Sequence, residues 1–272
     1  MKLKRLLAGA IASIAMLGAA SSIHAAVIKT DIIMIVDESG SMGTVQANLR
    51  TNIGLFASIL SAGGVDAQYG LVGYGDSQVR PRMLTDLTDP NSFATAAQGL
   101  RINGGTEPGY TATGFALNAL DNQSSLFSFR SDAVKNIIIF TDEPHNGTST
   151  SYGTINGVTP TLLTIDQLLT DNNALFNAVL SGTSTVNSYR SLAENHSGQV
   201  FALSGLNTTN QAAVESFVTA FAAAKLQETI DFCTANPTAP GCQPGTSVPA
   251  PGALALIGVG LFGLGIMRRR LS

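Results

Sequence analysis

The sequence predicts an α/β fold in which helices flank a doubly wound, mostly parallel central sheet of the Rossmann-like kind. The first observation is that residues 31–36 and 136–140 are almost continuous apolar runs, which is typical of strands buried on both faces. The second is that segments with apolar residues every three or four positions alternate with such runs. Alternating strands and helices of this kind indicate a parallel sheet covered on both sides.

The elements follow one another along the chain with recognisable boundaries. After the first strand, apolar residues recur with helical spacing from Val45 to Leu60, and Gly63-Gly64 ends that helix. A strand over 69–74 is followed by a strand over 78–87. The second is predicted to lie at the edge of the sheet, because Pro81 has no backbone N–H to donate to a neighbouring strand. The later elements are predicted to be helices over 91–100 and 113–120, the strand 136–140, a helix over 162–169, a strand over 174–180, a helical turn over 189–195, a strand over 199–203 and a closing helix over about 208–230.

The composition excludes two classes of protein. With 44% hydrophobic and only 12% charged residues, the chain is not intrinsically disordered. Its net charge of −3 and the lack of a basic stripe indicate that nucleic acid is not a partner.

The N-terminal residues 1–25 predict a secretory signal peptide. Lys2, Lys4 and Arg5 precede an apolar stretch, and small residues follow near Ala25. The apolar stretch is shorter than the roughly 20 residues that a transmembrane helix needs. We therefore expect the protein to be exported.

The C-terminal residues 248–272 predict a second targeting segment. The sequence Val-Pro-Ala-Pro at 248–251 precedes the uncharged apolar run 252–267 and the arginines 268–270. This order resembles the PEP-CTERM sorting signal of Gram-negative bacteria, although Ala250 replaces the usual Glu. The resemblance implies cleavage by an exosortase-type enzyme, a membrane segment that is at least transient, and delivery to the cell envelope or an extracellular matrix. A plain single-pass anchor is the alternative.

Between these ends we expect one acidic domain over 26–231 and a Cys/Pro-rich stalk over 232–247. The two ends hold six of the 15 Lys and Arg residues and none of the 18 acidic ones, so the remainder carries a net charge of −9. Cys233 and Cys242 are the only cysteines. In an exported protein, a disulfide between them is the expected arrangement.

Three loops predict a metal site. Asp37-Glu38-Ser39-Gly40-Ser41 follows the first strand, Thr141-Asp142-Glu143 follows the strand 136–140, and a Gly- and Thr-rich loop over 103–114 lies between them. Ligands of doubly wound sheets bind beyond the carboxyl ends of the strands. Carboxylates and hydroxyls suit Mg²⁺ or Mn²⁺. Taken alone, the first loop could instead cap the following helix.

The same residues resemble a von Willebrand factor type A (VWA) domain with its metal-ion-dependent adhesion site, over about Val27 to Ile230. The resemblance implies that Ser39 and Ser41 coordinate the ion and that a Thr of the second loop joins them. It also implies that Asp37 and Asp142 act directly or through water. The family's unbroken Gly-Gly-Thr-x-Thr-Gly is split here, so Thr111 is the expected ligand and Thr106 the alternative. Glu38 and Glu143 are expected to be solvated carboxylates.

The resemblance implies an adhesion or protein-binding module rather than an enzyme, with no catalytic residues. An Asp or Glu of a partner protein would complete the Mg²⁺ shell. One alternative is a structural component of the envelope or matrix without an adhesive partner. Another is a secreted esterase, suggested by Gly75-Asp76-Ser77 and by Asp142-x-x-His145, but both blocks lie in mid-chain. His145 is expected near the rim of the metal site, where protonation below about pH 6.5 would modulate binding.

Overall fold

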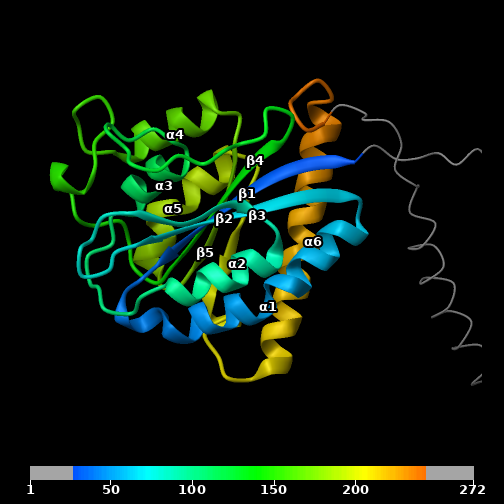
Figure 1. Ribbon diagram of the computed structural model, residues 1–272, viewed down its shortest axis with the longest axis horizontal. Coiled ribbons are helices and arrows are strands. Elements are labelled where there is room, and N and C mark those ends of the chain that lie inside the picture. Colours follow the sequence, from blue (N-terminus) through cyan, green and yellow to red (C-terminus); the bar gives the residue numbers. More distant parts are fainter. Residues whose placement is uncertain (1–26, 243–272) are drawn as a thin grey trace, which may run out of the picture. The chain divides into compact units, whose positions relative to one another are not determined.

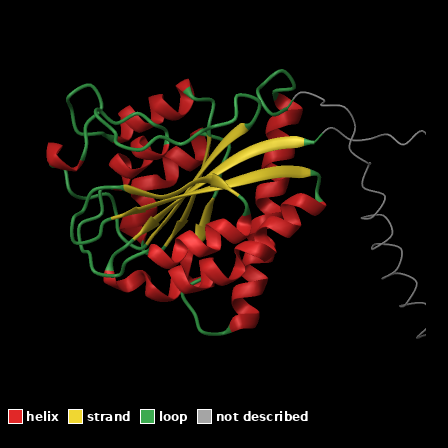
Figure 2. Ribbon diagram, in the orientation of Figure 1, coloured by secondary structure: helices red, strands yellow, loops and turns green. Residues whose placement is uncertain are grey.

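The structure is a computed structural model that describes residues 27–242, and its centre is a six-stranded sheet in the order β3-β2-β1-β4-β5-β6 (Figures 1 and 2). β3 runs antiparallel to β2, and the other neighbouring pairs are parallel. The strands are β1 (Ile28–Asp37), β2 (Val65–Tyr74), β3 (Arg82–Thr88), β4 (Val134–Thr141), β5 (Leu175–Leu180) and β6 (Val200–Ala202). The predicted fold class is therefore confirmed.

Helices cover both faces of the sheet, as Figure 2 shows. α1, α2 and α6 pack on one face, and α3, α4 and α5 pack on the other. The helices are α1 (Gly43–Ala62), α2 (Pro90–Ala96), α3 (Gly109–Ala116), α4 (Leu162–Asp171), α5 (Thr183–Asn195) and α6 (Gln211–Ala235).

β1 shows why the apolar runs are continuous. Ile32, Met34 and Val36 point into the core shared with α1 and α6, whereas Ile33 and Ile35 point into the core on the opposite face. Successive side chains of a strand alternate between faces. Because both faces of this sheet are buried, every position from Ile32 to Val36 is apolar.

Several predicted elements begin at other residues: β2 begins at Val65 instead of residue 69, and the helical turn predicted over 189–195 is the longer helix α5, which begins at Thr183. The physical reason is visible for α3 and β3. α3 covers residues 109–116 instead of 113–120, because the chain leaves the helix at Leu117 and Asn118 has a positive φ of 60°. β3 begins at Arg82 instead of residue 78. A turn precedes it, in which the Asp76 carboxylate accepts from the backbone N–H of Gln78 at 2.8 Å.

α6 and the segment after it form the end of the described chain. The predicted boundary at residue 231 falls inside this helix, and Cys233 near its end forms the expected disulfide with Cys242. The backbone of Gly241 then accepts a hydrogen bond from Lys29 N–H at 3.3 Å. The segment 236–242 therefore returns to the sheet.

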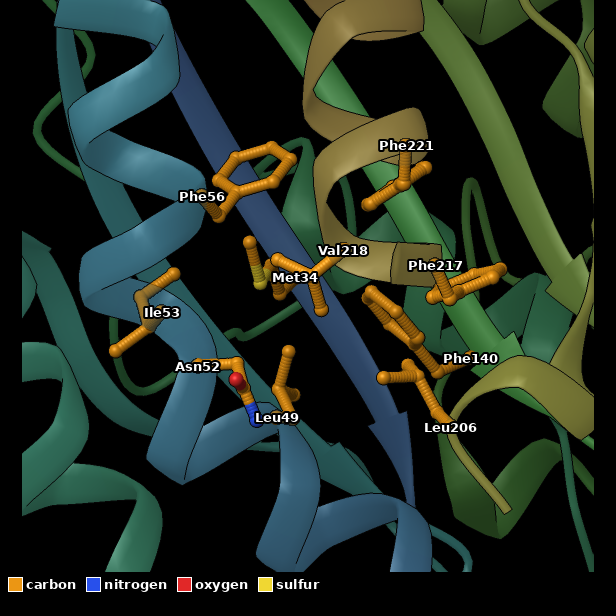
Figure 3. Close-up of a pocket in the computed structure, with 10 residues that line it drawn as sticks. All are labelled: Met34, Leu49, Asn52, Ile53, Phe56, Phe140, Leu206, Phe217, Val218 and Phe221. Atoms are coloured by element: carbon orange, nitrogen blue, oxygen red, sulfur yellow. The ribbon is translucent and has the colours of Figure 1, made fainter. Parts of the chain in front are cut away.

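A small cavity of about 20 Å³ lies between α1, β1, β4 and α6 (Figure 3). Its volume corresponds to about one water molecule. Side chains of α1 and α6 enclose it from two sides (Figure 3). Its lining residues are Met34, Leu49, Asn52, Ile53, Phe56, Phe140, Leu206, Phe217, Val218 and Phe221.

The predicted signal peptide and the predicted sorting segment lie outside the described residues. Within residues 27–242, none of the helices combines the length and the apolar character needed to cross a bilayer.

Candidate metal centre

Asp37 is the last residue of β1, and its buried carboxylate connects two strands. Oδ1 accepts a hydrogen bond from Ser39 N–H at 2.7 Å, and Oδ2 accepts from the Thr141 hydroxyl at 2.7 Å. Burial, with a smaller contribution from the negative charge of Glu107, raises the pKa of Asp37 to about 7, although the hydrogen bonds from Thr141 and Ser39 lower it. The carboxylate of Asp37 is thus oriented by its neighbours but has no cationic partner among them.

The hydroxyls of the first loop do not cap a helix. Ser39 precedes the short 3₁₀ helix Gly40–Met42, and its side chain makes no capping hydrogen bond. Its Oγ instead lies 3.1 Å from the Oγ of Ser41. Ser39 is buried and Ser41 is exposed, so the pair extends from the end of β1 to solvent. The capping interpretation of this loop is therefore not supported by its contacts.

The second loop lies against the first. The backbone N–H groups of Asn103 and Gly104 donate to the Glu38 carbonyl oxygen at 3.1 and 3.2 Å, and Ser39 forms a parallel bridge with Gly104. A Cβ on Gly104 would lie 1.4 Å from the Gly75 carbonyl oxygen. Only glycine allows this approach.

The two candidate threonines have different surroundings. Thr111 lies on α3, which packs against β1 and β4, and its buried Oγ1 has no hydrogen-bond partner among residues 27–242. Thr106 lies in the loop and is partly exposed, with its methyl group facing Gly147.

Asp142 follows β4 directly. Its backbone oxygen accepts from the Thr185 hydroxyl at 3.0 Å, and in the part of the chain that the structure describes its buried Oδ1 has no hydrogen-bond partner. Within residues 27–242, no three His, Cys, Asp or Glu side chains converge closely enough to hold a metal ion by themselves. A cation at this edge of the sheet would therefore need the hydroxyls of Ser39, Ser41 and Thr111 as well.

Glu107 is a buried acidic residue that the sequence interpretation missed. Its Oε2 accepts from the Asn146 side chain at 2.7 Å, and its Oε1 has no partner. Burial raises the pKa of Glu107, and the charges of Glu143 and Asp142 act in the same direction. The only signal in the sequence is an acidic residue inside the split Gly-Gly-Thr…Thr loop.

The expectation for Glu38 is wrong, because this side chain is fully buried. The Arg82 guanidinium donates to both of its carboxylate oxygens, and Arg101 N–H donates to Oε1 at 2.6 Å. Asp76 is buried too and pairs with Arg101. Adjacent residues at the end of a strand point to opposite faces, so Glu38 turns away from Asp37. Glu143, by contrast, is exposed as expected.

The proposed pH sensor His145 does not have the expected environment. Its ring stacks on Tyr110 with a centroid distance of 3.9 Å, and its Nδ1 accepts from Tyr110 N–H at 3.3 Å. Burial lowers the pKa of His145 to about 4. His145 is therefore neutral at the pH values where we expected it to titrate.

The esterase interpretation finds no support in the contacts of Ser77. This residue lies exposed in the turn before β3, where its backbone N–H donates to the Asn103 side chain at 3.2 Å. A serine nucleophile needs a histidine within hydrogen-bond distance. In the described part of the chain, the Ser77 hydroxyl has no such neighbour.

Fold and site together define a class: a doubly wound α/β domain with acidic and hydroxyl side chains gathered at the carboxyl ends of β1 and β4. The family model of the von Willebrand factor type A domain matches residues 31–215, which is more than half of the chain. The chain belongs to this family. Its domains are usually non-enzymatic interaction modules for protein binding or adhesion, and they commonly bind a divalent metal. A comparison with curated protein sequences finds no match.

Proposed function

We propose that this protein is an exported, metal-dependent adhesion or protein-binding module of the bacterial envelope or extracellular matrix. The observation that carries the proposal is the pair of buried, unpartnered oxygens at one edge of the sheet, Thr111 Oγ1 and Asp142 Oδ1. Burying a polar atom without a partner costs free energy. A hard divalent cation is the kind of group that would satisfy such oxygens.

The residues that would hold Mg²⁺ or Mn²⁺ are those of the predicted adhesion site, namely Asp37, Ser39, Ser41, Thr111 and Asp142. These residues would hold the cation from one side, and an Asp or Glu of a partner protein would complete its coordination shell. Thr141 and Ser39 N–H keep the Asp37 carboxylate oriented. Because Ser41 is exposed, the partner approaches from the side of the first loop.

Thr111 is the preferred threonine in this proposal. Its hydroxyl is buried and free of hydrogen bonds, which suits a ligand. Thr106 is partly exposed, and its methyl group faces Gly147. Replacing Thr111 by valine should therefore weaken cation binding more than the same change at Thr106.

The test of the site uses a hydroxyl that the fold does not need. Ser41→Ala removes one exposed hydroxyl, whose hydrogen-bond partner is Ser39, and it should weaken binding of Mg²⁺ measured by isothermal titration calorimetry. Ser77→Ala removes an exposed hydroxyl at the same end of the sheet and is the matched control. Equal affinities for the wild-type protein and Ser41→Ala would contradict the proposed ligand set.

The test of adhesion is capture of protein from the envelope fraction of the producing cell. We expect capture with Mg²⁺ and its loss with EDTA or in Ser41→Ala. Capture that neither treatment changes would contradict metal-dependent adhesion. Binding of Mg²⁺ without any capture would favour the structural role in the envelope or matrix.

The proposal of export rests on the two predicted targeting segments, residues 1–25 and 248–272, and on the disulfide. Structural disulfides persist in oxidising compartments, and Cys233 and Cys242 are joined in the structure. The C-terminal segment 248–272 is proposed to enter the membrane and to be removed by an exosortase-type enzyme. Mass spectrometry of the mature protein should show a first residue near Ala26 and loss of the arginines 268–270. A mature protein that retains residues 1–25 would contradict export by this route.

A further inference from the structure

Glu107 has no role in the ligand set proposed above, yet its carboxylate is buried at the same edge of the sheet. The residue is 1% exposed, and Oε1 has no hydrogen-bond partner. A carboxylate oxygen in this situation is costly unless something else compensates for the lost hydration.

Asn146 holds Glu107 by three hydrogen bonds. Glu107 N–H donates to Asn146 Oδ1 at 2.6 Å, Asn146 N–H donates to the Glu107 carbonyl oxygen at 3.0 Å, and Asn146 Nδ2 donates to Glu107 Oε2 at 2.7 Å. Asn146 lies in the loop that begins with Asp142. These three hydrogen bonds therefore fix the Glu107 carboxylate relative to this loop, and Oε1 takes part in none of them.

Glu107 and Asp37 approach the same point beside Gly75. A Cβ placed on Gly75 would lie 3.4 Å from Glu107 Cγ and 3.6 Å from Asp37 Oδ1. Glu107 also lies within electrostatic range of Asp142. The three carboxylates nevertheless do not converge closely enough to hold a metal ion by themselves. Glu107 therefore lies beside Asp37, next to the proposed cation site.

We propose that Glu107 is an outer-shell ligand of the cation, with Oε1 accepting a hydrogen bond from a cation-bound water and Asn146 setting its orientation. The proposal rests on the proposed cation site. Mg²⁺ usually keeps several waters in protein sites. Outer-shell groups that orient ligands typically change metal affinity by about 10–100-fold when they are lost.

The test is calorimetric titration of the full protein with MgCl₂ and with MnCl₂. We expect Glu107→Gln to weaken cation binding by about 10–100-fold. Asn146→Ala keeps the Glu107 carboxylate but removes the side-chain hydrogen bonds that orient it. We therefore expect a smaller loss of cation affinity. Glu143→Gln is the matched control, because it removes the same charge from an exposed position and should change the affinity by less than about threefold at physiological salt.

Thermal unfolding in EDTA separates this role from a purely structural one. Glu107→Gln removes a buried negative charge that no cationic side chain of residues 27–242 pairs with, so its metal-free unfolding temperature should equal or exceed that of the wild-type protein. A clearly lower temperature would overturn the proposal, as would an affinity of Glu107→Gln within threefold of the wild-type value or an equal loss in Glu143→Gln. Absence of binding in the wild-type protein would overturn the cation site itself, and the role of Glu107 with it.

Discussion

At the scale of single residues, the acidic side chains next to the site differ according to the face on which they lie. Asp37 and Glu38 are adjacent in sequence, but Asp37 contacts Thr141 of β4, whereas Glu38 pairs with Arg82 of β3. The ion pair of Glu38 with Arg82 therefore connects the first loop to the edge strand β3. Glu38 supports the loop that carries Ser39 and Ser41, and it is not a solvated charge that attracts cations.

His145 gives a prediction about acid stability. Its pKa is about 4 in the folded protein and near 6.5 in the unfolded chain, so between these pH values only the unfolded state binds the proton. The free energy of unfolding should fall as the pH decreases from 6.5 towards 4, with a contribution from His145 of up to about 3 kcal/mol. Urea unfolding of His145→Phe, which keeps an aromatic ring against Tyr110, should show a shallower decline. An equal decline in both proteins would contradict a half-buried histidine that is neutral above about pH 4.

At the scale of elements, α6 contributes an aromatic cluster to the apolar core, besides the aliphatic side chains of Val214 and Val218. Phe221 packs against Phe56 of α1, Phe140 of β4 and Phe201 of β6, at centroid distances of 5.3, 6.3 and 4.8 Å. It also lines the small cavity beneath the helix (Figure 3). The attachment of α6 to the sheet therefore depends strongly on this residue.

Phe221→Ala should lower the free energy of unfolding by about 3–5 kcal/mol, because the lost side chain leaves a void that joins the existing cavity. Leu163→Ala is the control, since Leu163 on α4 is 78% exposed and its loss should cost less than about 0.5 kcal/mol. Urea unfolding measures both variants. Similar losses in the two would show that α6 is not held by this cluster.

At the scale of the whole molecule, the last described residues, 236–242, pack back against the central sheet. The disulfide joins residues nine positions apart, and the segment between them contacts the beginning of β1. Cys233 also packs with Val134, Leu175 and Phe232. The segment that we interpreted as a stalk is thus, up to Cys242, part of the folded body.

Replacing both cysteines by serine should lower the free energy of unfolding by about 2–3 kcal/mol, as expected for a loop of about ten residues. For a domain of this size, the unfolding temperature should fall by about 5–10 °C. Differential scanning calorimetry in the presence and absence of a reductant checks this, and the reductant should have no effect on the double variant. An unchanged unfolding temperature on reduction would contradict a stabilising role of the disulfide.

The fold class, the order of the strands along the chain and the loops at the carboxyl edge of the sheet could be predicted from the amino-acid sequence alone. These properties depend on local periodicity and on where apolar runs end, and both can be read along the chain. Three features required the three-dimensional structure: which of the adjacent acids Asp37 and Glu38 faces the site, the burial of Glu107 beside it, and the stacking of the half-buried His145 on Tyr110. These properties depend on contacts between residues distant in sequence, such as Arg82 with Glu38 and Asn146 with Glu107, and no local pattern encodes them.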